Sequence, residues 1–132
     1  MLAGGCLCGK IRYEISAEPI HHTICHCVDC RRASGAFFVA WITVREADFR
    51  FVAGATKSHR SSAGVERAFC AECGTPLTYR NASFAGEVDV ATGTLDRPGE
   101  VPPRDHTWVS QKPAWVVLAD GLPHHARAGS ES

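Results

Sequence analysis

The sequence predicts a mainly β domain built from small antiparallel sheets. Short segments rich in alternating, β-branched or aromatic residues recur along the chain, and turn-forming residues separate them at short intervals. The 12 glycines and 7 prolines suit a chain with many tight connections. A length of 132 residues corresponds to one domain by the usual size of domains.

The strand predictions follow the chain in order. Residues 10–16 alternate between apolar and polar side chains, as a half-buried strand does, and residues 21–27 fit a short strand. Residues 36–44 are a continuous apolar run whose aromatic and β-branched content favours a buried strand over a helix. Further strands are expected at residues 49–52, 65–69, 77–80, 87–92 and 115–118.

One helical turn is expected between Asp29 and Ser34. Asp29 can cap its first turn, and Gly35 can end it. The segment 124–132 is polar, small and terminal, which indicates a loose tail after a domain at residues 1–123.

Charge and hydropathy exclude two classes of function. The 14 basic and 14 acidic residues cancel, whereas a nucleic-acid binder should carry a basic excess. The longest nearly apolar run, residues 36–44, is far shorter than the ~20 residues that a membrane-spanning helix needs. The first residues lack the basic and apolar stretches of a secretion signal, so we expect a cytoplasmic protein with reduced thiols.

The seven cysteines carry the strongest functional signal. Their odd number excludes complete internal disulfide pairing, and clustered cysteines in a reducing compartment more often bind metal. Cysteines two apart on a strand share a face, and a C-x-x-C pair followed by glycine is typical of a metal-binding turn. The groups are Cys6 and Cys8; Cys25, Cys27 and Cys30; and Cys70 and Cys73.

Zinc chemistry divides these seven residues into four and three. A structural zinc takes four protein ligands, whereas a catalytic zinc takes three and keeps one position open. Cys25, Cys27 and Cys30 are close enough in sequence to share one metal, which leaves the other four cysteines to form a second site. Two alternatives stay open for the trio. It can be a redox thiol cluster, or a structural site completed by His21, His22, His59 or His106.

Arg31 and Arg32 directly follow the trio. They can attract the carboxylate of a substrate, or they can be ordinary solvated arginines.

Six segments of the sequence resemble the glutathione-dependent formaldehyde-activating enzyme family, which also includes centromere protein V. Together they extend from about residue 4 to residue 123, and all seven cysteines fall within them. The segments are GGCLCGKIRYE (4–14), CHCVDCRRASGA (25–36), FCAECGTPL (69–77), HTWVS (106–110), PAW (113–115) and DGLP (120–123).

The resemblance implies a β-tent fold of small twisted sheets, shared with methionine sulfoxide reductase B. It implies two zinc ions per chain, one structural and one catalytic. The structural ligands would be Cys6, Cys8, Cys70 and Cys73, and the catalytic ligands Cys25, Cys27 and Cys30. The implied reaction joins glutathione and formaldehyde into S-hydroxymethylglutathione, which is a carbon–sulfur lyase reaction run in reverse. The implied partners are a small thiol and an aldehyde.

Two further residues are candidates for the site. His106 is a possible acid or base, or it hydrogen-bonds a strand end. Trp108 is the best candidate for a pocket wall, whereas Trp41, Trp115, Phe37 and Phe38 are expected mainly in the core. Two functions compete with the lyase: a non-catalytic zinc module that binds a partner, and a redox or zinc-handling thiol protein.

Overall fold

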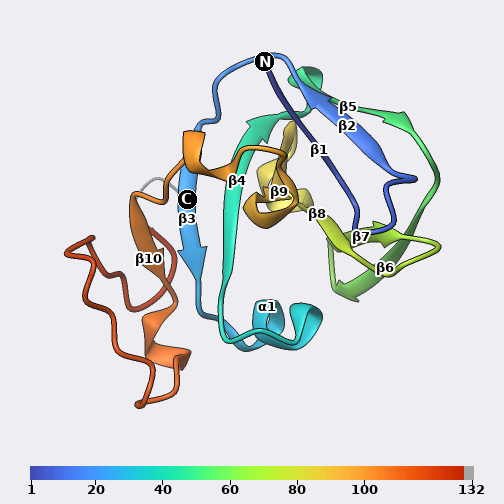
Figure 1. The fold of residues 1–132 in the computed structure, drawn as a ribbon. Helices are drawn as coiled ribbons and strands as arrows, with labels where there is room; N and C mark the ends of the chain where they lie inside the picture. Colours follow the sequence, from blue (N-terminus) through green and yellow to red (C-terminus); the bar gives the residue numbers. More distant parts are fainter. Residues whose placement is uncertain (130–132) are drawn as a thin grey trace.

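Ten strands form two sheets in the computed structural model, which describes residues 1–129 (Figure 1). The mainly β prediction is confirmed. The smaller sheet contains β1 (Leu2–Gly5), β2 (Arg12–Ile15) and β5 (Phe49–Ala53), in that order. The larger sheet has the order β10 (Asp105–Thr107), β3 (His21–Cys25), β4 (Val39–Arg45), β9 (Glu87–Ala91), β8 (Pro76–Asn81), β7 (Val65–Cys70) and β6 (Thr56–Ser62).

The larger sheet is mixed rather than purely antiparallel. β10 pairs parallel to β3, with Asp105 opposite Thr23 and Thr107 opposite Cys25, and every other pairing between these strands is antiparallel. The helix α1 (Val28–Ser34) follows β3. Short 3-10 turns lie at Glu46–Asp48, Ala82–Phe84, Thr92–Thr94, Pro98–Glu100 and Val109–Gln111. No helix in the described residues is long and apolar enough to cross a membrane.

The main core lies between the two sheets. The alternating face predicted for residues 10–16 is confirmed, because Ile11, Tyr13 and Ile15 are all fully buried. They pack with apolar side chains from the larger sheet, which come from β4, β8 and β9: Ile42, Val44, Leu77, Val88 and Val90. This packing positions the larger sheet, in which β3 carries Cys25 and β7 carries Cys70.

Two predictions about apolar residues are wrong. Residues 115–118 form no strand; Trp115 is 67% exposed and Val117 is 81% exposed. Phe37 and Phe38 precede β4 and are each 45% exposed, and the Phe37 ring contacts Trp115 with centroids 4.5 Å apart. Only Trp41 of the four residues expected in the core is buried there.

The helix prediction is correct in place but wrong in its cap. Cys27, not Asp29, is the N-cap, and its Sγ accepts a hydrogen bond from the Cys30 N–H. Gly35 ends the helix in the left-handed conformation (φ 73°), as expected of a C-terminal glycine.

The segment predicted as a tail begins beside β10. Residues 123–127 exchange backbone hydrogen bonds with residues 106–110, and His124 forms a parallel bridge with His106. The last three residues of that prediction, 130–132, lie outside the described residues.

Candidate metal centres and cavity

The four-cysteine cluster joins the two sheets. Cys6 and Cys8 lie between β1 and β2, whereas Cys70 ends β7 and Cys73 lies in the turn before β8. Their four Sγ atoms all lie within 4.8 Å of one another, with Cys6–Cys8 at 3.4 Å and Cys8–Cys70 at 3.8 Å. Tetrahedral zinc with Zn–S bonds of ~2.3 Å separates its sulfurs by about 3.8 Å. The donor set therefore fits a structural zinc.

Backbone and hydroxyl groups around this cluster favour thiolates. The N–H of Ile11 donates to Cys6 Sγ at 3.2 Å, and the N–H of Cys73 donates to Cys70 Sγ at 3.4 Å. Hydrogen bonding from Thr75 lowers the pKa of Cys73 to about 5. Thiolate is the form that binds metal, so the surroundings suit the same ion as the geometry does.

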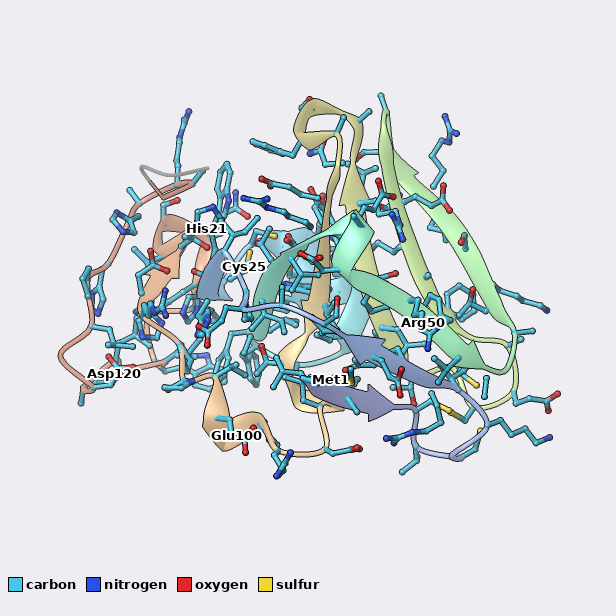
Figure 2. All side chains as sticks on the ribbon, turned by 90° about the horizontal axis from the view of Figure 1, so that it is seen from above. Met1, His21, Cys25, Arg50, Glu100 and Asp120 are labelled. Carbon is cyan, nitrogen blue, oxygen red and sulfur yellow. The ribbon has the colours of Figure 1, made fainter. Side chains whose placement is uncertain are left out.

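The three-cysteine cluster forms where β3 runs into α1. Cys25 is the last residue of β3, Cys27 caps α1 and Cys30 lies in its first turn. The three Sγ atoms lie within 4.8 Å of one another. Hydrogen bonds from the Cys25 and Cys30 thiols lower the pKa of Cys27. The two groups of sulfur atoms lie well apart in the molecule (Figure 2).

Histidine does not complete this trio. Within residues 1–129, no fourth histidine, cysteine or carboxylate lies within 4.8 Å of all three sulfurs. His59 lies on β6 and is exposed, and His22 Nδ1 pairs with the Pro102 carbonyl. Three sulfur donors with no fourth protein ligand match the donor set of an open zinc site.

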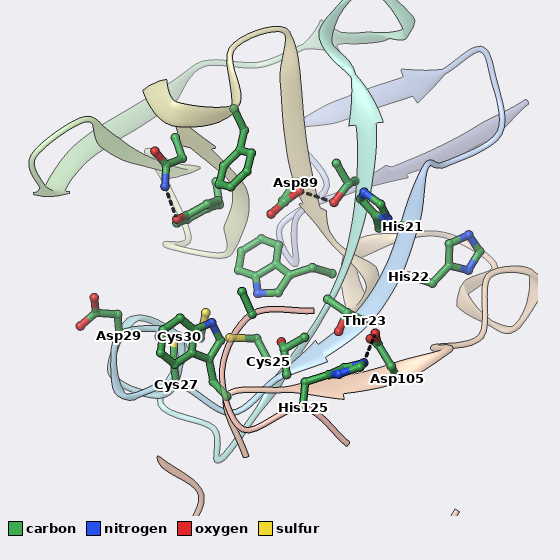
Figure 3. Close-up of a pocket in the computed structure, with 18 of the residues that line it drawn as sticks. His21, His22, Thr23, Cys25, Cys27, Asp29, Cys30, Asp89, Asp105 and His125 are labelled. Carbon is green, nitrogen blue, oxygen red and sulfur yellow. Dashed lines mark hydrogen bonds and ion pairs between the residues drawn. The ribbon is translucent and has the colours of Figure 1, made fainter. Parts of the chain in front are cut away.

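A cavity of about 1000 Å³ adjoins the trio, and all three of its cysteines line the wall. Figure 3 shows the three cysteines grouped in one part of the cavity. Asp89 and His21 lie in a second part, and the His125–Asp105 pair lies in a third. None of the other four cysteines is among the described lining residues. Trp108 lines the cavity together with Trp41 and Tyr79.

Arg67, on β7, brings a cation beside the trio. Its Nη2 lies 3.9 Å from Cys30 Sγ, and its guanidinium lies over the Tyr79 ring, 4.9 Å from the centroid. Arg104 also lines the cavity, at its exposed rim. Arg31 and Arg32 do not line it, although they follow Cys30 directly. A seven-residue helix presents its side chains around a full circle, so neighbours of a ligand in sequence can face away from it.

Four carboxyl groups line the same cavity, those of Asp29, Glu87, Asp89 and Asp105. Burial raises the pKa of Asp89 to about 6, although the Thr43 hydroxyl donates a hydrogen bond to it at 2.6 Å. Asp105 Oδ2 lies 3.2 Å from His125 Nε2. Together these groups give the cavity separate cationic, anionic and proton-exchanging positions.

The structure places His106 on the opposite face of the sheet from this cavity. Its neighbours Asp105 and Thr107 line the cavity, whereas His106 is buried behind them. Its Nδ1 is 2.9 Å from His26 Nε2 and its Nε2 is 2.7 Å from Asp120 Oδ2. His26 also points away from the cavity, as strand alternation predicts between Cys25 and Cys27.

Sequence reasoning missed Arg67, Arg104, Asp89 and His125. A signal was available for Arg67, which shares the strand face of Val65 and Phe69, and an arginine on an apolar face is unusual. Asp89 sits between two valines and gives no such signal. His125 faces the cavity only because of a long-range pairing with β10.

Two comparisons with known proteins bear on this site, one with a family model and one with a solved structure. A family model described as glutathione-dependent formaldehyde-activating enzyme matches residues 1–111. A crystal structure of a Rhodobacter sphaeroides protein, a structural-genomics target, is similar with a TM-score of 0.62 and 22% identity. The likeness covers 93% of this chain and 98% of that one, and it shows a shared fold.

Proposed function

This chain belongs to the glutathione-dependent formaldehyde-activating enzyme family, and we propose on that premise that it is a zinc-dependent carbon–sulfur lyase. In the proposed reaction, a thiol such as glutathione adds to a small aldehyde. The thiol sulfur bonds to the carbonyl carbon, the carbonyl π pair moves to oxygen, and the thiol proton ends on that oxygen. The reverse reaction breaks the same carbon–sulfur bond.

The observation that carries this proposal is the position of Cys25, Cys27 and Cys30 in the wall of the large cavity. These three residues would hold the catalytic zinc, and the other four cysteines the structural one. A zinc ion at the trio supplies Lewis acidity that favours a thiolate or polarises a carbonyl oxygen. The Arg67 guanidinium beside Cys30 offsets negative charge that accumulates on the sulfurs.

The charges of the cavity suit a zwitterionic thiol. Arg67 and Arg104 can each bind a carboxylate, and Asp89 can bind an ammonium group. Glutathione carries an ammonium group and a carboxylate at one end and a second carboxylate at the other. The volume of about 1000 Å³ is large enough for a ligand of that size and an aldehyde.

We assign to His125 the transfer of the proton from the thiol to the forming hydroxyl. Asp105 holds one ring nitrogen of His125 at 3.2 Å, which orients the imidazole inside the cavity. Imidazole exchanges protons near neutral pH, so it can take the thiol proton and return one to the forming hydroxyl. We assign to His125 the acid–base role that the sequence suggested for His106, because His125 is on the side of the cavity.

The test measures exchange between glutathione and formaldehyde by NMR, with and without enzyme. Wild type should accelerate the exchange, and Cys27→Ser should abolish the acceleration while the protein stays folded. Arg67→Gln should raise KM for glutathione about 10- to 150-fold, since a charged hydrogen bond contributes about 1.5–3 kcal/mol. The matched control is Arg60→Gln, on the exposed strand β6, which should behave as wild type.

Three outcomes would argue against the lyase. Full activity in Cys27→Ser would remove the trio from catalysis. Folded, zinc-loaded protein that is inactive toward a panel of thiols and aldehydes would favour a non-catalytic zinc module. Ready disulfide formation within the trio under mild oxidant, without lyase activity, would favour a redox role. The proposed chemistry suits a reducing compartment such as the cytoplasm, where the thiols stay available.

A further inference from the structure

A third group of metal-binding side chains lies on the face of the sheet opposite the large cavity. His106, Asp120 and His124 each direct one donor atom to a common point, and these atoms lie within 4.8 Å of one another. None of the three residues lines the cavity of the cysteine trio.

The backbone places His124 beside His106. The two residues form a parallel bridge, and hydrogen bonds flank it: His106 N–H to the Pro123 carbonyl at 2.9 Å and His125 N–H to the His106 carbonyl at 2.8 Å. Residues paired in this way present their side chains on the same face. The two imidazole rings meet edge to face, with centroids 5.3 Å apart.

The His106 ring is held on its other side by a second histidine. His106 is 2% exposed, and its Nδ1 lies 2.9 Å from Nε2 of the fully buried His26. A bound cation would replace the proton that His106 Nε2 shares with Asp120 Oδ2, and His106 Nδ1–H would then donate to His26 Nε2. A metal-binding histidine commonly donates its remaining N–H to such a partner, which fixes its tautomer and orientation.

The Asp120 carboxylate completes the group. Its Oδ1 accepts the Leu122 N–H at 3.1 Å, which turns Oδ2 toward His106 at 2.7 Å. Asp120 and His124 are exposed, so the common point is open to solvent and to ions. One ionised carboxylate and two neutral imidazoles are ligands that divalent first-row metals accept.

We propose that His106, Asp120 and His124 form a third metal site, which binds one divalent transition-metal ion such as Zn²⁺. His26 positions His106 for that ion through the Nδ1–H···Nε2 hydrogen bond. The site uses nitrogen and oxygen ligands only, and it depends neither on the cysteines nor on the lyase activity. Three protein ligands leave the remaining positions of the ion to water or a ligand.

The experiment counts zinc bound to the reduced full-length chain after dialysis against buffered Zn²⁺. Wild type should hold one more zinc per chain than His124→Ala and than Asp120→Asn. His59→Ala, which removes an exposed histidine elsewhere, should equal wild type. Both changed residues are exposed, and circular dichroism verifies that the variants remain folded.

A thiol-blocking reagent then assigns the missing ion. It displaces zinc from cysteines, so the amount it releases should be equal in wild type and His124→Ala. The proposal is overturned if His124→Ala holds as much zinc as wild type. It is also overturned if the zinc that His124→Ala lacks is missing from the fraction that the reagent releases. Inactivity toward thiols and aldehydes would overturn the proposed function without changing this zinc count.

Discussion

At the scale of single residues, the same side chain acts differently according to its neighbours. The Asp89 carboxyl loses water on burial, which raises its pKa to about 6, whereas Asp96 has a lowered pKa because Arg12 binds it. The two carboxyl groups therefore affect the pH dependence of stability with opposite signs.

Asp89→Asn should stabilise the protein at neutral pH. The folded-state pKa lies above the unfolded value, so the native carboxyl binds its proton more tightly and stability falls as pH rises from about 4 to 6. The difference between an unfolded pKa of about 4 and the folded pKa of about 6 corresponds to about 2–3 kcal/mol of lost stability above pH 6. Thermal melts at pH 7.5 should show the gain, and melts at pH 4 should not.

Asp96→Asn provides the contrast. Its folded-state pKa is lowered, so its contribution to stability is present above the unfolded pKa and disappears in acid. This variant should be less stable than wild type at pH 7.5, and the difference should shrink as the pH falls below the ordinary aspartate pKa. If Asp96→Asn were more stable than wild type at pH 7.5, pairing with Arg12 would not be the cause of its lowered pKa. If Asp89→Asn were no more stable than wild type, burial would not be the cause of its raised pKa.

His125→Gln tests the proton carrier. The variant should lower kcat about 100-fold with a smaller change in KM, because general acid–base catalysis contributes ~10²–10⁴-fold and glutamine transfers no proton. His59→Gln is the control, and an equal loss of kcat there would contradict a specific role for His125.

The residues of the site were only partly predictable. Local spacing groups Cys25, Cys27 and Cys30, because a strand end and the first helical turn bring them together. His106 and His125 could not be told apart, because the face that each presents depends on the parallel pairing of β10 with β3 and of residues 123–127 with β10. Such register is a tertiary property.

At the scale of elements, the apolar pattern of the sequence predicted the buried strands but not the edge strands of the larger sheet. β4 and β9 lie inside the larger sheet; β4 carries a nearly continuous apolar run, and β9 alternates between charged residues and valines. β6 is an edge strand with exposed polar residues, and β10 has only three residues, so neither carries a strand pattern. Residues 115–118 carry the pattern but find no partner strand among the described residues.

β1 depends on a glycine that no pattern identifies. A Cβ on Gly4 would lie 2.4 Å from the Thr94 carbonyl oxygen and 2.4 Å from the Tyr13 hydroxyl oxygen. Gly4→Ala should therefore lower the stability by about 1–3 kcal/mol, since backbone and a buried ring must move. Urea unfolding measures this loss. Gly99→Ala, where a Cβ meets no atom within 4 Å, should cost much less.

At the scale of the whole molecule, the four-cysteine cluster connects chain segments that are far apart in sequence. It ties the β1–β2 connection of the smaller sheet to the β7–β8 turn of the larger one. The cysteine spacing and the resemblance of the sequence motifs both predicted this grouping, and the structure brings the four sulfurs together.

Cys70→Ser should destabilise the whole fold, because the sulfur is buried and its loss uncouples metal binding from folding. We expect Tm to fall by more than about 10 °C, which corresponds to roughly 3 kcal/mol for a domain of this size. A strong chelator should have the same effect on wild type. Cys27→Ser should melt close to wild type, and an equally large drop in Tm would contradict the division into a structural and a catalytic site.

The pairing of residues 123–127 with residues 106–110 sends two consecutive histidines to opposite faces of one sheet. His124 meets His106, and His125 meets Asp105. A slip of this pairing by one residue would move one histidine into the position of the other and leave the second position without an imidazole, whereas length changes absorbed in the preceding loop leave both in place. The same pairing register therefore determines a side chain on each of two chemically unrelated faces. Homologous chains should keep both histidine positions or change both together.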